Sequence, residues 1–447
     1  MTRSLICLAL LAAACAPVGP DYVRPDLAMQ ARFAEGDAAA IGEVATRRWW
    51  TAYNDAMLND LVARGLAQNL DIAVAVERIR AAEAGLRAAG AAAAVSGDAG
   101  GSWTRQGGDG QSVTQGNSVS LSGSVVLDLF GGLRRGAQSA AADLAAAEAD
   151  EGTARLAYLS AITAAYIDAR YYQEALALNR QQIELQRETL EMTRAKLAAG
   201  SATRYELVQA QAAFDASQAG IPGQESSFLA QVYAIATLLG EPSGPLIAAM
   251  EPGRAQPRAG QGLSLGMPAE LLRNRPDVRA AEQALIGATA DVGVAEADLL
   301  PSISLSGTLS QTRGNAWSFG PDISLPVLSQ PRLRAERARA ISQAKQAEID
   351  WRATILGAVE DVQSAHSRWL RLRREAELRE TSVRSYEEAA RLSRGAFAAG
   401  SLQLTDLLDD DSTLAGARIS LAGTVRDLAS EWAAVQVALG AGAYAEP

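Results

Sequence analysis

Two segments of the chain alternate between apolar and hydroxyl-bearing side chains. Residues 117–129 place valine and leucine on one side and serine on the other, and residues 301–311 repeat the pattern with isoleucine and leucine against serine and threonine. A period of two over about ten residues predicts β-strands. Each strand needs a hairpin partner, and residues 95–106 and 317–328 are predicted to supply them. From the pattern alone, the sheet could be half-buried in a soluble domain or could cross a membrane.

Two long stretches, residues 135–198 and 334–398, follow the predicted strands and contain no proline. Apolar residues recur in them at helical spacing, as at Leu156, Leu159 and Tyr166. A helix of roughly 60 residues is about 90 Å long and cannot bury itself in a globule. These helices are therefore predicted to lie against neighbours along their length, as in a coiled coil or a helical barrel.

The sequence Ala-Ala-Gly-Ser ends both long stretches, and Gly200 and Gly400 occupy the same place in it. A glycine at a helix C-terminus can take positive φ and let the chain reverse. The two sites are predicted to be the tips of helical hairpins, at about 198–204 and 398–405. The predicted caps of the returning helices are Ser201 or Thr203 in the first hairpin and Ser401 or Thr405 in the second.

The match between the two tips is part of an internal duplication. Residues 69–86 resemble residues 275–292, and in both places a helix leads into an alternating segment and then a long helix. The chain is interpreted as two tandem copies of about 200 residues each. The expected layout is a first repeat at 51–240, an equatorial linker at 241–265, a second repeat at 266–440 and a C-terminal tail at 441–447.

The N-terminus is predicted to be an export signal. Residues 1–14 carry one positive charge and an apolar run that is too short to span a bilayer as a helix. Small residues lead to Cys15, which resembles a bacterial lipobox with Ala12 where leucine is usual. That resemblance implies acylation of Cys15 and a lipidated extension over residues 15–50. The alternative is an ordinary signal peptide with an incidental cysteine.

Composition removes several classes of function. The formal net charge is -10, which disfavours nucleic acid as a partner. The only cysteines are Cys7 and Cys15, and His366 is the only histidine. The usual transition-metal clusters and Cys/His nucleophile pairs are therefore absent, so no metal, no cofactor and no enzymatic activity are expected. His366 is interpreted as a solvated residue on a helix.

Four strands do not close a sheet. In lipid every backbone N–H and C=O must be paired, so an open four-stranded sheet requires further copies of the chain. Two copies would give an eight-stranded barrel, whose interior is filled by side chains. Three copies would give a twelve-stranded barrel, which leaves a passage. Outward valine and leucine with inward serine fit a water-filled pore.

Four motifs together resemble a known family. They are "VGPDYVRP", "RRWWTAYNDAMLNDLVARGLAQNLDI", "LDLFGGLRRG" and "LLRNRPDVRAAEQALIGATADVGVAEADLLPSISLSG". The chain resembles the TolC-like outer membrane factors, in their lipoprotein branch. The resemblance implies an α+β membrane protein: a homotrimer with a twelve-stranded β-barrel in the outer membrane, four strands from each chain, joined to a long periplasmic α-helical barrel.

The same resemblance implies a function. The chain would be a passive duct that receives cargo from an inner-membrane efflux transporter through a periplasmic adaptor (membrane fusion protein). It would be anchored in outer-membrane lipid and extend into the periplasm. The motifs do not specify the cargo or the class of pump. The alternative function is a periplasmic adaptor or scaffold lipoprotein built from helical hairpins, although an adaptor would normally have one long hairpin flanked by soluble β domains.

The resemblance also implies a periplasmic gate. The acidic residues shortly after the second glycine turn are Asp406 and Asp409, and three chains would place six carboxylates around one axis. Asp406 also fits a structural role, because a negative charge is favourable in the first turn of a helix. Arg194 and Arg394 could pair with these acids, contact the adaptor, or simply complement the C-terminal helix dipole.

Three further positions are interpreted structurally. Pro222 predicts a break in the helix returning from the first tip. Pro276 is predicted to start a helix. Trp49 and Trp50 are expected to pack near the first helix rather than at a lipid interface.

Overall fold

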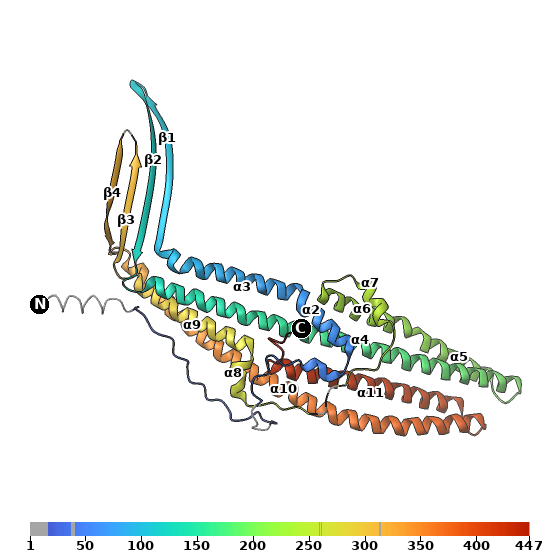
Figure 1. The fold of residues 1–447 in the computed structure, drawn as a ribbon. Helices are drawn as coiled ribbons and strands as arrows, with labels where there is room; N and C mark the ends of the chain where they lie inside the picture. Colours follow the sequence, from blue (N-terminus) through green and yellow to red (C-terminus); the bar gives the residue numbers. More distant parts are fainter. Residues whose placement is uncertain (1–16, 37–40, 259, 261, 313, 447) are drawn as a thin grey trace. The chain divides into compact units, whose positions relative to one another are not determined.

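The computed structural model describes residues 17–36, 41–258, 260, 262–312 and 314–446 (Figure 1). The predicted signal peptide and Cys15 lie outside the described residues. The chain divides into two compact units. Unit 1 comprises Met1–Ala28, Ala75–Glu151 and Asp277–Leu356, and unit 2 comprises Met29–Val74, Gly152–Pro276 and Gly357–Pro447. None of the helices in the described part of the chain is long and apolar enough to cross a membrane.

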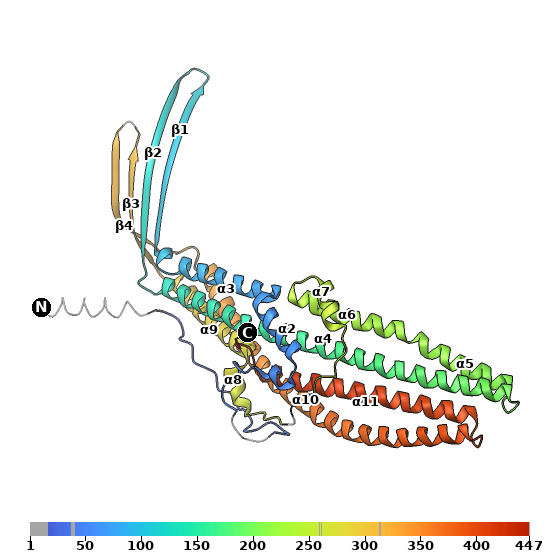
Figure 2. The same cartoon turned by 45° about the vertical axis from the view of Figure 1, so that its right-hand side comes forward.

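Unit 1 contains a four-stranded antiparallel sheet in the order β1-β2-β3-β4 (Figures 1 and 2). The strands are β1 Val95–Gly108, β2 Gln111–Leu127, β3 Ser302–Gln311 and β4 Asn315–Ser324. Strands from the two repeats meet at the centre, where β2 pairs with β3. The two hairpins predicted from the alternating pattern are therefore present, and they join edge to edge within one chain.

The bounds of all four strands differ from the predicted ones, by one or two residues in β1 and β3 and by more in β2 and β4. Strand β2 begins at Gln111 rather than at 117, because the polar residues after the turn continue to pair with β1 as far as Gly108. It also ends at Leu127 rather than at 129. Strand β4 covers Asn315–Ser324 rather than 317–328, and Pro326, which has no N–H to donate, follows its end.

Helix α3 (Leu70–Ala89) and the short 3-10 helix η2 (Ala91–Ala94) lead into β1, and α9 (Pro276–Ala297) leads into β3. Helix α9 begins at Pro276, as predicted, with Asp277 in its first turn. Each hairpin is followed by a long helix, α4 (Gly132–Ala198) or α10 (Gln330–Ala398). Both long helices begin three or four residues earlier than predicted, and they run from unit 1 into unit 2.

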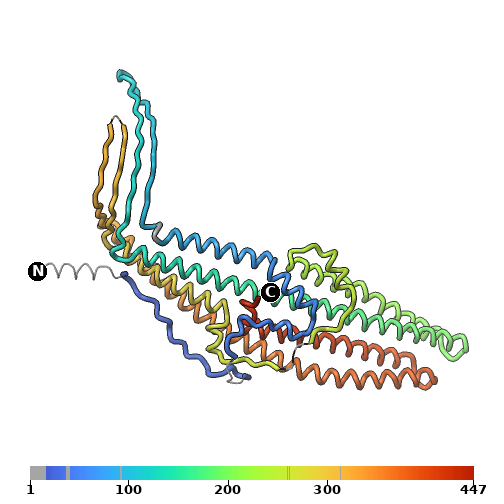
Figure 3. Tube along the Cα trace, viewed as in Figure 1, coloured from blue at the N-terminus to red at the C-terminus, as the bar shows by residue number. Residues whose placement is uncertain are grey.

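Unit 2 holds two helical hairpins, which lie side by side in Figures 1 and 3. In the first, α4 is followed by α5 (Arg204–Ala219) and α6 (Ile221–Leu239), which are separated at Gly220. The break predicted from Pro222 is therefore present. In the second, α10 is followed by α11 (Leu404–Ala438), which continues without a break.

Both hairpin tips use the same backbone turn. Gly200 and Gly400 have φ of 77° and 82°, in the left-handed region that favours glycine. In each tip the N–H of the following serine donates to the carbonyl five residues back, and the glycine N–H donates to the carbonyl three residues back. These paired bonds are a Schellman motif, which satisfies the last carbonyls of the helix.

The caps of the returning helices differ between the repeats. Thr203 caps α5: its hydroxyl accepts from the N–H of Glu206, whose carboxylate accepts from the N–H of Thr203. The predicted cap at Ser401 or Thr405 is wrong, because Gln403 occupies the N-cap of α11 and makes no side-chain cap bond. Ser201 and Ser401 instead donate their hydroxyls back to the ends of α4 and α10.

The expected linker and tail are both more ordered than predicted. Helix α7 (Ser243–Met250) lies within the expected linker and buries Leu246 and Met250. The C-terminal residues are packed rather than trailing, since Ala441, Ala443 and Ala445 are fully buried. Their backbone pairs with the N-terminal segment: the N–H of Tyr444 donates to the carbonyl of Ala45 at 2.8 Å.

An aromatic cluster holds the start of the first repeat in unit 2. The 3-10 helix η1 (Trp49–Tyr53) precedes α2 (Ala56–Gln68) and buries Trp49 and Trp50. Trp49 and Tyr53 make edge-to-face contacts with Trp432 of α11 at centroid distances of 6.0 and 5.3 Å. The packing role expected for these tryptophans is confirmed. The interpretation of His366 is wrong: it lies on α10 but is buried and stacks on Trp369.

The remaining short helices follow the linker. They are η3 (Pro268–Glu270) and α8 (Leu271–Asn274), which precede α9.

Candidate functional site

The sheet has two chemically distinct faces. Because paired residues on neighbouring strands project to the same side, the register assigns every strand residue to a face. The apolar face comprises Val95, Ala99, Trp103, Val119, Leu121, Val125, Leu127, Ile303, Leu305, Leu309, Trp317, Phe319, Pro321 and Ile323. The opposite, hydroxyl face comprises mainly Ser96, Ser102, Thr104, Thr114, Ser118, Ser120, Ser122, Ser124, Ser302, Ser304, Ser306, Thr308, Ser310, Ser318 and Ser324, with Asp98 and Asp322.

Large apolar side chains on the apolar face are largely exposed in the described part of the chain. Trp317, Phe319 and Ile323 are 78%, 70% and 68% exposed. An exposed apolar surface of this extent marks a contact with lipid or with another protein. The hydroxyl face carries small side chains that water can solvate, so the sheet is built to separate an apolar environment from an aqueous one.

Both edges of the sheet are open. Within the described residues, β1 pairs only with β2 and β4 pairs only with β3. Pro321 removes one backbone N–H donor from β4. The open edges leave a row of backbone donors and acceptors for another chain.

The second hairpin tip presents two carboxylates to solvent. Asp406 lies in the first turn of α11 and Asp409 one turn later, and both are exposed. Neither carboxylate has a hydrogen-bond or ion-pair partner among the residues described. Leu404 and Leu407 of the same helix are buried in an apolar cluster that also contains Phe397. The helix is thus fixed by its leucines, and the two carboxylates are left available.

The two aspartates that follow Asp409 make contacts within the hairpin. Asp411 is completely buried, and its Oδ1 accepts from Nε and Nη2 of Arg394 at 3.1 and 2.7 Å. Burial raises the pKa of Asp411, and the guanidinium of Arg394 offsets part of that rise. Asp410 accepts a hydrogen bond from the hydroxyl of Ser393. Both pairs tie α11 to α10 below the tip.

The two predicted arginines do not contact the predicted gate residues. Arg394 pairs with Asp411 rather than with Asp406 or Asp409. Arg194 pairs with Glu191 on its own helix and donates to Gln211 of α5 at 3.0 Å. In each repeat the arginine six residues before the tip glycine therefore reaches the residue eleven positions after it. That repeat relationship could have identified Asp411 from the sequence.

One contact at the tips was missed by the sequence analysis. Lys196 of the first hairpin donates to the carbonyl of Phe397 in the second, and its ammonium lies 3.8 Å from the centre of the Phe397 ring. The equivalent residue of the second repeat is Ala396, which cannot reciprocate. The second hairpin therefore has no equivalent side chain to make this contact with the first. The sequence near Lys196 did not predict the contact.

Two buried carboxylates hold the N-terminal segment, which also was not predicted. In unit 1, Glu282 of α9 accepts from Tyr22 at 2.9 Å and from Nε and Nη2 of Arg24 at 2.7 Å each. Burial and the Glu282 carboxylate raise the pKa of Tyr22 to about 12. In unit 2, Glu270 accepts from the backbone N–H groups of Ile41 and Gly42.

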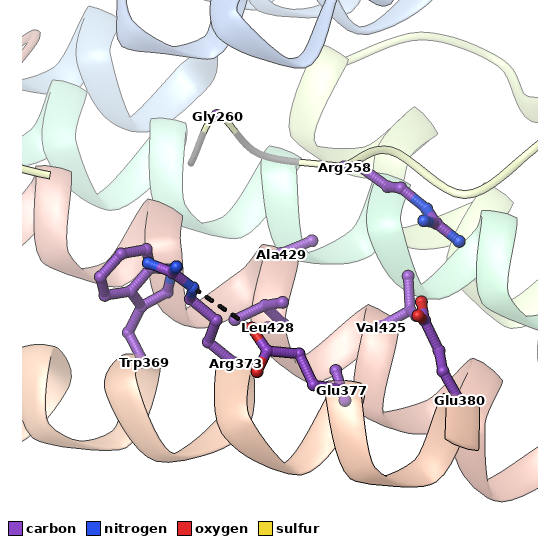
Figure 4. Close-up of a pocket in the computed structure, with 10 residues that line it drawn as sticks. Arg258, Gly260, Trp369, Arg373, Glu377, Glu380, Val425, Leu428 and Ala429 are labelled. Carbon is purple, nitrogen blue, oxygen red and sulfur yellow. Dashed lines mark ion pairs between the residues drawn. The ribbon is translucent and has the colours of Figure 1, made fainter. Parts of the chain in front are cut away.

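A cavity of about 410 Å³ lies beneath the linker in unit 2. Figure 4 shows Trp369, Arg373, Glu377 and Glu380 of α10 on one side and Arg258 of the linker on another. Arg373 forms an ion pair of 3.8 Å with Glu377. The formal charges of the two arginines and two glutamates at this cavity sum to zero. Across the described residues, no three His, Cys, Asp or Glu side chains are grouped so as to hold a metal ion.

Comparison with known proteins gives these features a context. A family model described as "Outer membrane efflux protein" matches residues 61–241 and 267–441, one match to each repeat. Nodulation protein T of Rhizobium leguminosarum bv. trifolii is 38% identical over 97% of this chain and 96% of that protein. The pyoverdine export outer membrane protein OpmQ of Pseudomonas aeruginosa is 30% identical over 93% and 91%. Among solved structures, the outer-membrane channel OprN has a TM-score of 0.86 at 29% identity, covering 96% of this chain and 100% of that one.

These similarities confirm the predicted fold class and the predicted location in the outer membrane. They also favour a channel component of an efflux system over a periplasmic adaptor, because the matches cover both repeats and the sheet that an adaptor would lack. The family model covers most of the chain, and relatives at 38% and 30% identity span nearly all of it. The chain belongs to the outer membrane efflux protein family.

Proposed function

We propose that three copies of this chain close their sheets into one twelve-stranded barrel that conducts solutes across the outer membrane. The observation that carries the proposal is the sheet itself, with two open edges, an apolar face and a hydroxyl face. In hydrocarbon each unpaired backbone group costs several kcal/mol, so β4 of one copy must meet β1 of the next. Three copies leave an aqueous passage lined by hydroxyl groups, whereas the lumen of an eight-stranded barrel is filled by side chains.

The duct is passive and works with two partners. It receives cargo from an inner-membrane efflux transporter through a periplasmic adaptor, and the transporter supplies the energy. The relatives support this assignment: one is named for pyoverdine export and another, CusC of Escherichia coli, for cation efflux. The hydroxyl face of the sheet carries mostly small, chemically similar side chains, so we assign the selection of cargo to the transporter. The chain itself catalyses no reaction and needs no cofactor.

Asp406 and Asp409 form the periplasmic gate. Three copies place six carboxylates around the axis, and such a ring attracts cations and repels anions. The support is that both are exposed and have no partner among the residues that the structure describes, in contrast to the buried Asp411 two residues after Asp409. Arg194 and Arg394 act within their own hairpins, where they hold the two helices together.

Cys15 is the site of lipid attachment. It lies two residues before Pro17, where the described N-terminal segment begins, and that segment is held to α9 by Glu282. An acyl chain at Cys15 would give the protein a second membrane anchor, in addition to the membrane-spanning strands.

Planar-bilayer recording of the purified protein tests the duct and its gate together. The wild type is expected to run as a heat-modifiable trimer from outer-membrane fractions and to form channels that a trivalent cation blocks. Asp406→Asn with Asp409→Asn should raise the half-blocking concentration about tenfold, because the carboxylates that attract the blocker are gone. Asp215→Asn, at an exposed carboxylate of α5, is the matched control and should leave block unchanged. A salt-extractable monomer without channel activity would contradict the duct.

A further inference from the structure

The hydroxyl face of the sheet carries charge of one sign only. Among the described strand residues, its charged side chains are Asp98 on β1 and Asp322 on β4, and no arginine or lysine projects from that face. The strand arginine, Arg105, lies on the other face, opposite Gln115. The two aspartates are embedded in rows of serine: Asp98 lies opposite Ser122, and Asp322 lies opposite Ser304.

The positions of these aspartates along the strands are also distinctive. Asp98 lies three residues after Val95, where β1 begins, and Asp322 lies two residues before Ser324, where β4 ends. At about 3.3 Å per residue, both carboxylates lie within about 10 Å of the same end of the sheet, where the strands meet the helices. Within one chain they are kept apart by β2 and β3.

Closure of the barrel changes that separation. Strands β1 and β4 are the two edges of the sheet, so each subunit boundary pairs β4 of one copy with β1 of the next, antiparallel. Antiparallel pairing brings the end of β4 beside the beginning of β1. Asp322 of one copy and Asp98 of the next then face the lumen at the same end of each boundary.

We infer that Asp98 and Asp322 form a second cation-selective ring, within the barrel and separate from the carboxylates at the hairpin tip. This inference rests on the proposed trimeric duct. Six carboxylates toward one end of the barrel, with no arginine or lysine on the hydroxyl face of the described strands, create a negative potential that enriches cations and excludes anions. The serine hydroxyls around them solvate a passing ion without adding charge. Selection by charge would therefore persist in a channel whose tip is held open.

Reversal potentials in planar bilayers under a KCl gradient test the ring. In about 0.1 M salt, Asp98→Asn with Asp322→Asn should lower the potassium-to-chloride permeability ratio about threefold or more, because the lost carboxylates act over a Debye length of about 10 Å. In about 1 M salt the Debye length is about 3 Å, and the difference from wild type should largely disappear. Trimer formation and the unit conductance in concentrated salt should match the wild type, since both replacements keep the side-chain shape.

Two comparison variants locate the effect. Asp109→Asn changes a carboxylate in the turn of the same hairpin, roughly 36 Å of strand away from Asp98, and should leave the permeability ratio unchanged. Asp406→Asn with Asp409→Asn should alter block at the tip, and the effect of the barrel replacements should persist in that background. A wild type that forms no channels would refute the duct, and this inference with it. Channels whose permeability ratio is the same with and without Asp98 and Asp322 would refute the barrel ring alone.

Discussion

Arg394 and Asp411 join the two helices of the second hairpin through an ion pair of 2.7 Å, whereas the equivalent positions of the first hairpin hold Arg194 and Gln211 at 3.0 Å. The geometry is shared, but the electrostatics are not. The carboxylate of Asp411 is fully buried, and its second oxygen has no hydrogen-bond partner. In the first hairpin the acceptor is a neutral amide and the arginine is half-exposed.

Removing the two arginines should therefore have unequal effects. Arg394→Gln leaves a buried carboxylate without its cation, which should lower the free energy of unfolding by about 2–3 kcal/mol; the 30% exposure of Arg394 keeps the loss below that of a fully buried pair. Arg194→Gln should change it by less than about 1 kcal/mol. The apparent unfolding midpoint of each variant, measured by loss of helical circular dichroism, gives the comparison. Equal shifts would show that the buried charge has no special role.

Glu270 should make stability dependent on pH in the acid range. Burial alone would raise its pKa, but backbone N–H donors from Met267, Ile41 and Gly42 outweigh burial and hold the pKa below its ordinary value of 4.5. A carboxyl whose pKa is lowered in the folded state contributes stability above its unfolded pKa and loses it as the pH falls through the folded value. Glu270→Gln should thus lower the free energy of unfolding by about 1–3 kcal/mol at pH 7.

The same difference should shrink as the pH falls below about 4.5, because the wild-type carboxyl then takes up a proton and loses its advantage. Unfolding midpoints at several pH values measure it. Glu188→Gln, at an exposed position on α4, serves as the control and should show no such convergence. A gap between wild type and Glu270→Gln that stays constant from pH 7 to pH 3 would contradict the assignment.

The contact of Tyr22 and Arg24 with Glu282 should protect the N-terminal segment from proteolysis. Charge-assisted hydrogen bonds contribute about 1.5–3 kcal/mol, and cleavage follows the population of the opened segment. Glu282→Gln is expected to speed chymotryptic cleavage after Tyr22 about tenfold or more, with the cleavage site read by mass spectrometry. Glu77→Gln removes a carboxylate from an exposed ion pair on α3 and should leave the rate unchanged. If both variants are cleaved like the wild type, Glu282 does not hold the segment.

The C-terminal residues should be essential for folding. Ala443 is fully buried beside Leu156 and Ala45, so Ala443→Asp would place a charge where it has neither water nor a partner. We expect a loss of more than about 4 kcal/mol, seen as absence of the folded, protease-resistant protein from membranes. Glu446→Ala alters an exposed residue of the same segment and should accumulate normally. Normal yields of both variants would show that the protein folds without the packing of Ala443 at this position.

Local patterns predicted most of the fold because the features they encode are local. The alternation in β2 and β3, the proline-free stretches 135–198 and 334–398, and the positive φ at Gly200 all follow from a few neighbouring residues. Element ends were less predictable. Strand β2 extends through polar residues because β1 offers a partner, and the cap of α11 is a glutamine that no capping rule selects.

The site residues also fall into those that could be predicted from the sequence and those that could not. Asp406 and Asp409 could be proposed from the family resemblance together with their position shortly after Gly400. The burial of Asp411 depends on another helix, and the contact of Arg24 with Glu282 joins residues 258 positions apart. Neither relationship leaves a periodic trace in the sequence. Comparing the two repeats position by position, as at Gln211 and Asp411, recovers part of this long-range information.

The open edges of the sheet have a genetic consequence. A subunit that enters the bilayer alone leaves two rows of backbone groups unsatisfied, so insertion and assembly must occur together. In a cell that makes normal and blocked but assembly-competent subunits in equal amounts, only about one trimer in eight would be composed wholly of normal chains. Defective alleles whose products still assemble should therefore be dominant over the normal allele, whereas alleles that prevent strand pairing should be recessive.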